Sequence, residues 1–149
     1  MKIEEEIQQT KPFNSNYQKV IINLFFSNNW LGYRQKSFFK QYGLTLKQYN
    51  ILRILRGAGE PLSTCNIRER MLDKMSDASR IVDRLEKKRF ISKEQCKSDQ
   101  RKIDVSITDS ALQLMNKIDL TLYEWQKNII NLTEKEAGQL SDLLDKMRK

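Results

Sequence analysis

The segment 76–90 carries the clearest helical pattern in the chain. Its apolar residues fall on one stripe of a helix: Ile81, Val82, Leu85 and Phe90. One face of the predicted helix therefore packs on a core, and the other face meets solvent or a partner. Ser76 is expected to cap this helix, because a serine hydroxyl can accept a hydrogen bond from a free backbone N–H group of the first turn.

The polar face of this helix begins with short side chains and an arginine. Its members are Asp77, Ser79, Arg80, Asp83, Arg84 and Lys87. Short polar groups beside an arginine are typical of a helix that reads base edges in the major groove of DNA. A solvated helix face has a similar composition, so the segment alone leaves both interpretations open.

Two helical patterns open the chain after a polar lead-in. The first covers 17–42 and is predicted to end at Gly43, since glycine favours the left-handed conformation that follows many helices. The second covers 46–57 and begins with a capping box, in which Thr45 and Gln48 satisfy each other's backbone N–H groups.

A short third helix is predicted over 64–72, after the glycine-rich turn at 57–61. Ser63 is expected to cap it, and its inward residues are Ile67, Met71 and Leu72. Residues 73–75 then form a turn into the segment 76–90. A helix, a tight turn and a helix with a polar face make a helix-turn-helix.

After the helix-turn-helix, the apolar pattern changes to strict alternation. Two alternating runs, 91–96 and 103–107, enclose a polar tip at 97–102, which predicts a β-hairpin. Leu62 is expected to add one short edge strand. A hairpin in this place is the wing of a winged helix, although an unrelated α+β domain can also contain a hairpin.

Two arms of long helices, 15–43 and 109–149, flank the winged core at 44–108. Thr108 is expected to cap the helix after the wing, whose apolar residues recur at steps of three and four: Leu112, Met115, Ile118, Leu122, Trp125 and Ile129. A second capping box, in Thr133 and Glu136, opens the last helix. The arms carry more apolar residues than one small core covers, so we expect them to pair with a second copy of the chain.

The charge of the chain is concentrated in its middle. The formal net charge is +8, and residues 31–110 hold 18 Lys and Arg against 10 Asp and Glu, which accounts for all of the excess. Both ends are neutral. A basic middle that contains the candidate reading helix favours a polyanion as partner.

The residue types exclude most catalytic chemistry. The chain has no histidine, its two cysteines form no CxxC pair, and its five glycines fit no phosphate-binding loop. We therefore expect no enzyme, no cofactor and no metal site. Acidic residues stand where a signal peptide would be basic, and no apolar run is long enough for a membrane span, so a cytoplasmic location is expected.

The order of these elements and several local motifs resemble the MarR family of bacterial transcription regulators. The resemblance covers about 17–149 and is sharpest in LTLKQYNILRIL (44–55), LSTCNIRERM (62–71), SRIVDRLEKKRFISK (79–93) and SDQRKIDVSIT (98–108). Family members often have glycine where Arg89 stands, so Arg89 carries strain if this position is left-handed. Neither Cys65 nor Cys96 matches the cysteine of peroxide-sensing relatives, which lies in the first helix.

The resemblance assigns roles to the wing. It implies that Asp99 braces the wing and that Arg101 enters the minor groove, where an arginine reads groove width. Lys97 and Lys102 are candidate phosphate contacts. The other candidate DNA contacts are Ser63, Thr64, Lys74, Ser76, Asp77, Ser79, Arg80 and Arg84; among them Lys74 and Arg84 could also be solvated surface.

The resemblance also implies an effector pocket between the arms and the core. Its candidate residues are Phe26, Trp30, Arg34, Tyr49 and Trp125, each of which could instead belong to the core. A small aromatic or phenolic effector is the candidate ligand, with Arg34 as a possible partner for a carboxylate.

The sequence thus predicts a mainly α fold with a small β-hairpin, a winged helix-turn-helix core within a single domain over 1–149. The predicted function is a homodimeric, sequence-specific DNA-binding regulator, a repressor released by a small ligand at a palindromic operator. The alternative is a winged-helix protein–protein interaction module, with its basic middle facing an acidic partner.

Overall fold

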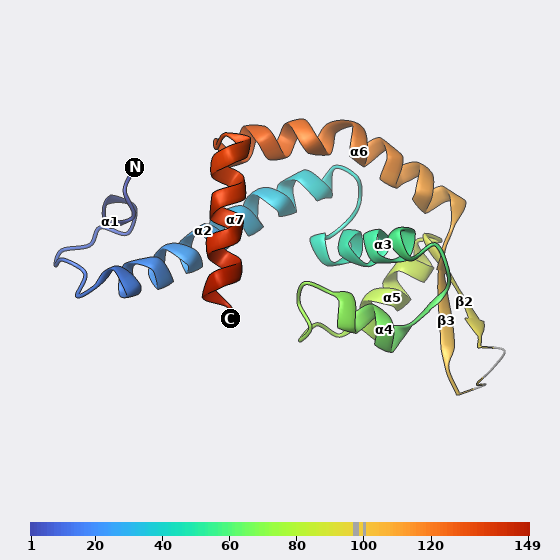
Figure 1. The fold of residues 1–149 in the computed structure, drawn as a ribbon. Helices are drawn as coiled ribbons and strands as arrows, with labels where there is room; N and C mark the ends of the chain where they lie inside the picture. The colour runs from blue at the N-terminus through green and yellow to red at the C-terminus, as the bar shows by residue number, and fades with distance from the viewer. Residues whose placement is uncertain (97–98, 100) are drawn as a thin grey trace. The chain divides into compact units, whose positions relative to one another are not determined.

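The computed structural model describes residues 1–96, 99 and 101–149, and it divides into two compact units at 1–51 and 52–149. The described residues form helices with one small sheet (Figure 1). The helices are α1 (Ile3–Glu6), α2 (Asn16–Lys40), α3 (Leu46–Ala58), α4 (Thr64–Arg70), α5 (Ala78–Lys87), α6 (Asp109–Ile130) and α7 (Glu134–Met147). The mainly α prediction with a small β part is confirmed.

The unit 1–51 is organised around the long helix α2. Ser15 caps this helix by accepting a hydrogen bond from the backbone N–H of Gln18. Gly43 follows it with φ +68°, where the N–H groups of residues 43 and 44 bond to the carbonyls of residues 40 and 39. This pattern is a Schellman motif, so the helix ends as predicted. Beyond it, Tyr49 stacks on the buried Phe39, with ring centroids 4.3 Å apart.

The unit 52–149 contains a three-stranded antiparallel sheet. Its strands are β1 (Leu62–Ser63), β2 (Ile91–Gln95) and β3 (Ile103–Ile107), in the order β1-β3-β2. Val105 lies opposite both Leu62 and Lys93 and is fully buried. The hairpin and the short edge strand are therefore both present as predicted.

Helices α4 and α5 and the hairpin form a winged helix-turn-helix. Ile67, Val82 and Leu85 are buried, and they supply the inner faces of the two helices. Ser63, Thr108 and Thr133 cap α4, α6 and α7 through their side-chain oxygens, as predicted.

Two details near the turn differ from the predictions. Asp77, not Ser76, caps α5: its carboxylate accepts the backbone N–H of Arg80 at 3.1 Å, whereas the Ser76 hydroxyl donates to Asp73 at 2.7 Å. Leu72 is 77% exposed instead of inward. Helix α4 ends at Arg70 and Met71 is extended, so the helical spacing that would turn Leu72 inward no longer applies.

The end of α5 has an unusual backbone conformation. Arg89 lies in the left-handed region with φ +60°. The N–H groups of Arg89 and Phe90 bond to the carbonyls of Glu86 and Leu85, which is a second Schellman motif. The carbonyl of Arg89 also accepts the hydroxyls of Thr108 and Ser110 at 2.9 and 3.0 Å. The anticipated strain at Arg89 is therefore present.

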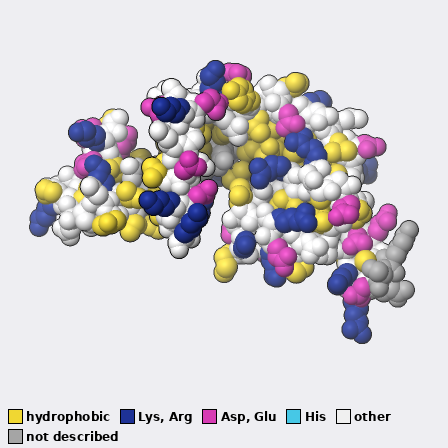
Figure 2. Space-filling view, viewed as in Figure 1, with side chains coloured by type: hydrophobic (Ala, Val, Ile, Leu, Met, Phe, Trp, Pro, Cys, Tyr) yellow, Lys and Arg dark blue, Asp and Glu magenta, His cyan; other side chains and the backbone are white. Residues whose placement is uncertain are grey.

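Both outer arms expose large apolar side chains, and apolar surface is visible in several places in Figure 2. Those of α2 include Tyr17, Val20, Ile21, Phe25 and Tyr33, and those of the C-terminal arm include Leu120, Tyr123, Leu140, Leu143 and Met147. Helix α7 has no buried residue. Within the described ranges, no helix combines the length and the apolarity that crossing a bilayer requires.

Candidate nucleic-acid interface

Helix α5 presents a polar face because its apolar face is fully used by the core. Ala78, Val82 and Leu85 are buried, which turns Ser79 and Arg80 outward. Arg80 lies one turn after the capping carboxylate of Asp77, with its Nε 3.7 Å from an Asp77 oxygen. The first turn of α5 therefore displays a hydroxyl, a carboxylate and a guanidinium at the surface.

Lys93 on strand β2 ties helix α5 to the wing. Its ammonium group pairs with Asp83, and with Glu86 at 2.9 Å. The hydrogen bond from Lys93 lowers the pKa of Asp83, and the hydrogen bonds to Asp83 and Glu86 raise the pKa of Lys93. This cluster fixes the face of α5 that borders the wing, so Lys93 is not available to a ligand.

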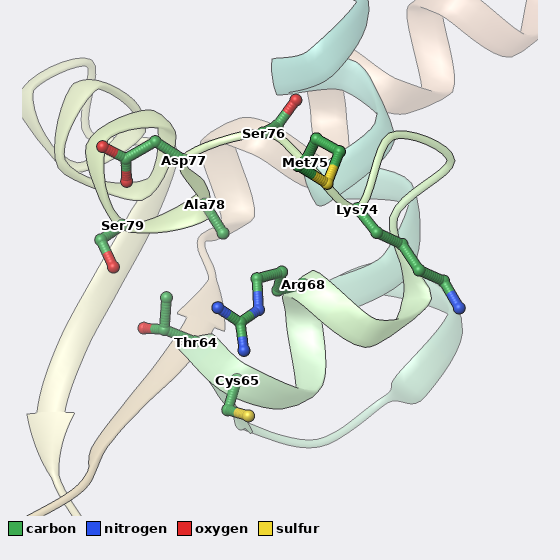
Figure 3. Close-up of a pocket in the computed structure, with 9 residues that line it drawn as sticks. All are labelled: Thr64, Cys65, Arg68, Lys74, Met75, Ser76, Asp77, Ala78 and Ser79. Carbon is green, nitrogen blue, oxygen red and sulfur yellow. The ribbon is translucent and has the colours of Figure 1, made fainter.

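Ser76 lies beside the first turn of α5 but faces away from the surface. The residue is 8% exposed, and its hydroxyl is bonded to Asp73. In Figure 3 the hydroxyl points away from the other labelled side chains. Ser76 therefore shapes the turn between α4 and α5.

A groove of about 600 Å³ separates the starts of α4 and α5. It is lined by Thr64, Cys65 and Arg68 of α4, by the turn at 74–76 and by residues 77–79 (Figure 3). The predicted contacts Thr64, Lys74, Asp77 and Ser79 all border this groove, whereas Ser63 caps α4 through Asn66.

Arg68 was not predicted as a site residue. Its side chain extends from α4 into the groove, toward the first turn of α5 (Figure 3). The signal in the sequence was its spacing: Arg68 follows Thr64 by four residues, so both lie on one helix face. An exposed arginine on a short helix otherwise has no distinguishing pattern.

The described part of the wing tip is held by Asp99. Its carboxylate accepts the backbone N–H of Arg101 at 3.1 Å, and its carbonyl accepts the N–H of Lys102 at 2.9 Å. The Lys102 ammonium lies 3.7 Å from an Asp99 oxygen. Arg101 is exposed. Lys97 lies outside the described residues.

Several basic side chains near α4, α5 and the wing carry an uncompensated charge. Among the described residues, no ion pair or hydrogen bond engages the side-chain charge of Arg68, Lys74, Arg84 or Arg101. Groups of acidic, cysteine and histidine side chains that could hold a metal are absent from the described ranges. The surface therefore offers positive charge, hydroxyls and one helix face.

The predicted effector residues lie in both units. Phe26, Trp30, Arg34 and Tyr49 belong to 1–51, and Trp125 to 52–149. The Arg34 guanidinium lies 5.7 Å from the centre of the Trp30 ring, a cation–π arrangement. Tyr49 is buried in its stack with Phe39. The structure thus brings Trp30 and Arg34 together, and it gives Tyr49 a core role.

Comparison with known proteins gives consistent matches. The model of the MarR family matches residues 44–103. The HTH-type transcriptional regulator PecS of Dickeya dadantii is 26% identical over 114 residues, which are 74% of this chain and 69% of PecS.

Solved structures share the fold along most of the chain. An organohalide-sensing transcriptional regulator bound to 2,4-dichlorophenol is 17% identical with a TM-score of 0.79, over 94% of this chain and 86% of the other. A mutant of E. coli MarR in complex with operator DNA is 19% identical with a TM-score of 0.75, and the match covers 83% of this chain and 89% of the MarR chain. The matched segment 44–103 and the shared fold thus support a winged helix-turn-helix transcriptional regulator of the MarR type.

Proposed function

We propose that this chain is a homodimeric, sequence-specific DNA-binding repressor that a small ligand releases from a palindromic operator in the cytoplasm. The observation that carries the proposal is the first turn of α5, which exposes Ser79 and Arg80 on a helix whose other face is buried. The operator complex of E. coli MarR, which has the same fold, supports DNA as the partner.

The proposed contacts divide by chemistry. Asp77, Ser79 and Arg80 face base edges in the major groove, where hydroxyls, carboxylates and arginine distinguish base pairs. Arg101 enters the adjacent minor groove, whose negative potential attracts arginine. The proposed phosphate contacts are Ser63, Thr64, Lys74, Arg84, Lys97 and Lys102. Ser76 contributes by holding the turn, since its hydroxyl is already bonded to Asp73.

The proposed dimer uses the arms 15–43 and 109–149, and the DNA-binding core is 44–108. Large exposed apolar side chains on α2, α6 and α7 support this division, because an exposed apolar surface favours association with a second chain. A two-fold axis between the arms would place two α5 helices about one DNA turn apart, roughly 34–36 Å. A palindromic operator follows from that symmetry.

The proposed effector is a small phenolic or aromatic compound. The organohalide-sensing relative binds 2,4-dichlorophenol, and this chain has Trp30 and Arg34 in contact on an exposed part of α2. An arginine beside an aromatic ring suits a flat ligand with an acidic group. Phe26 of α2 is a further candidate contact, and Trp125 of α6 is a candidate that the family resemblance alone implies.

Titration of a duplex from the chain's own promoter tests the DNA assignment. A specific regulator should hold its site about 10³–10⁷-fold tighter than random DNA and lose affinity steeply with salt. Arg101→Ala should weaken specific binding by about 1–3 kcal/mol. Lys127→Ala, a basic residue of α6 outside the winged core, is the control and should bind like the wild type.

The same titration distinguishes the alternative of a protein–protein module. Binding with equal affinity to all duplexes, and an unchanged affinity in Arg101→Ala, would favour that alternative. A footprint with and without phenolic acids then tests release, since an effector should uncover the operator at concentrations that leave the fold intact.

A further inference from the structure

We infer that Arg68 binds one backbone phosphate of the DNA in the groove between α4 and α5. The inference rests on the proposed function and adds a contact from the supporting helix. Arg68 is exposed, and its guanidinium has no partner among the described residues. A guanidinium presents a planar fork of donors that matches phosphate oxygens.

The groove has the remaining features of a phosphate site. Thr64 lies on the same wall as Arg68, and Ser79 lies across from them on α5 (Figure 3). The Thr64 hydroxyl can donate to a phosphate oxygen, as can the backbone N–H groups at the start of α5. Ser79 remains directed at the base edges. Arg68 and Ser79 are exposed on the two walls, so a DNA strand can reach the groove.

One acidic group borders the groove. The Asp77 carboxylate would repel a phosphate, but it already accepts the N–H of Arg80 and lies 3.7 Å from the Arg80 guanidinium. These two contacts offset its charge. With this charge offset, Arg68 and Lys74 leave the lining of the groove with a net positive charge, which attracts a phosphate.

The rim of the groove favours a DNA phosphate over a free phosphate ion. Met75 lines the groove and is 95% exposed, so it offers an apolar surface beside the charged site. A backbone phosphate brings a sugar that can cover such a surface, whereas an isolated ion brings nothing apolar. The exposure of Met75 is thus explained by a strand lying across the groove.

The test pairs an arginine variant with single neutralised phosphates in the duplex. Arg68→Ala should weaken binding about tenfold, equally for the operator and for random duplexes, and should lower the slope of log affinity against log salt by about 0.9. Arg68→Lys should recover part of this loss, because a lysine keeps the charge without the fork. Arg70→Ala, an exposed arginine on the same helix but outside the lining of the groove, is the matched control.

Methylphosphonate substitution then identifies the phosphate. At one position per half-site, neutralising the phosphate should weaken the wild type and leave Arg68→Ala unaffected. The phosphate assignment is wrong if Arg68→Ala binds DNA as tightly as Arg70→Ala. It is also wrong if the loss of affinity in Arg68→Ala depends on the identity of one base pair in the duplex. In both cases the proposed function stands. If the wild-type chain binds no duplex, both the phosphate assignment and the proposed function are wrong. Unchanged thermal unfolding of each variant separates these outcomes from misfolding.

Discussion

Arg89 shows how a single residue can carry strain within a well-packed domain. It occupies the left-handed position of a Schellman motif with φ +60°, where Gly43 stands in the equivalent motif after α2. A side chain in this conformation costs about 1–2 kcal/mol, because Cβ approaches the backbone. The hydroxyls of Thr108 and Ser110 hold the carbonyl of Arg89 and offset part of that cost.

Replacing Arg89 should therefore stabilise the protein. We expect Arg89→Gly to raise the free energy of unfolding by about 0.5–1 kcal/mol, the relief of strain less the extra freedom of glycine in the unfolded chain. Urea unfolding followed by circular dichroism measures this change in the free energy of unfolding. Gly43→Ala is the reverse experiment: a Cβ there meets no atom within 4 Å, so its expected loss of about 1 kcal/mol is purely conformational. A urea midpoint lower in Arg89→Gly than in the wild type would show that Arg89 is not strained.

At the scale of elements, the ion-pair cluster between α5 and β2 joins helix α5 to the wing. Lys93 bridges Asp83 and Glu86, and its hydrogen bond lowers the pKa of Asp83. A carboxyl whose pKa is lower in the folded state stabilises the fold above its ordinary pKa. This stabilisation is lost as the pH falls through the lowered value.

The cluster should make the free energy of unfolding depend on pH in the acidic range. Between about pH 5 and pH 2, the free energy of unfolding should fall less in Asp83→Asn than in the wild type, since the variant has no carboxyl to protonate at this site. Asp142→Asn, at an exposed position of α7, is the control and should keep the wild-type slope. Equal slopes in all three proteins would show that the cluster contributes nothing.

The elements were largely predictable from the sequence, because their ends are marked by local chemistry. Capping residues such as Ser63 and Thr108 accept a hydrogen bond from a backbone N–H three residues later. Both partners are therefore close in the sequence, and the cap can be predicted from it. The choice between Ser76 and Asp77 was not predictable in this way. Both can cap, and the hydrogen bond from Ser76 to Asp73 leaves Asp77 as the cap.

The candidate site was predictable only in part. Polar residues of α5 and of the wing follow from the helical and alternating patterns. Arg68 does not, because its importance comes from a groove formed by two helices, and a pattern along one helix cannot reveal what faces it. Tyr49 was assigned to the effector pocket through the family resemblance, with a core role as the alternative, and its stack on Phe39 supports the core role.

At the scale of the whole molecule, the exposed apolar arms predict the assembly. Phe25 on α2 and Leu143 on α7 are 69% and 63% exposed, so a charge at either position should leave the fold intact. Each apolar side chain buried between two chains contributes about 1.5–3 kcal/mol to association. We expect the double variant Phe25→Glu and Leu143→Glu to sediment as one subunit, with reduced affinity for a palindromic duplex.

The control for this prediction adds charge without removing an apolar group. Gln139→Glu places a carboxylate on an exposed position of the same helix α7 and should sediment as two subunits, like the wild type. A wild-type mass of one subunit at micromolar concentration would overturn the proposed dimer.

The carbonyl of Arg89 has a mechanical consequence. It accepts hydrogen bonds from the hydroxyls of Thr108, the N-cap of α6, and of Ser110 in the first turn of α6. The end of α5, the entry to the wing and the base of the C-terminal arm therefore meet at this carbonyl. A tilt of α6 relative to α5 and the hairpin would therefore strain both hydrogen bonds, which favours movement of these elements together. In the proposed dimer, we expect an effector that tilts α6 to move α5 and the hairpin with it and so to change the distance between the two winged cores.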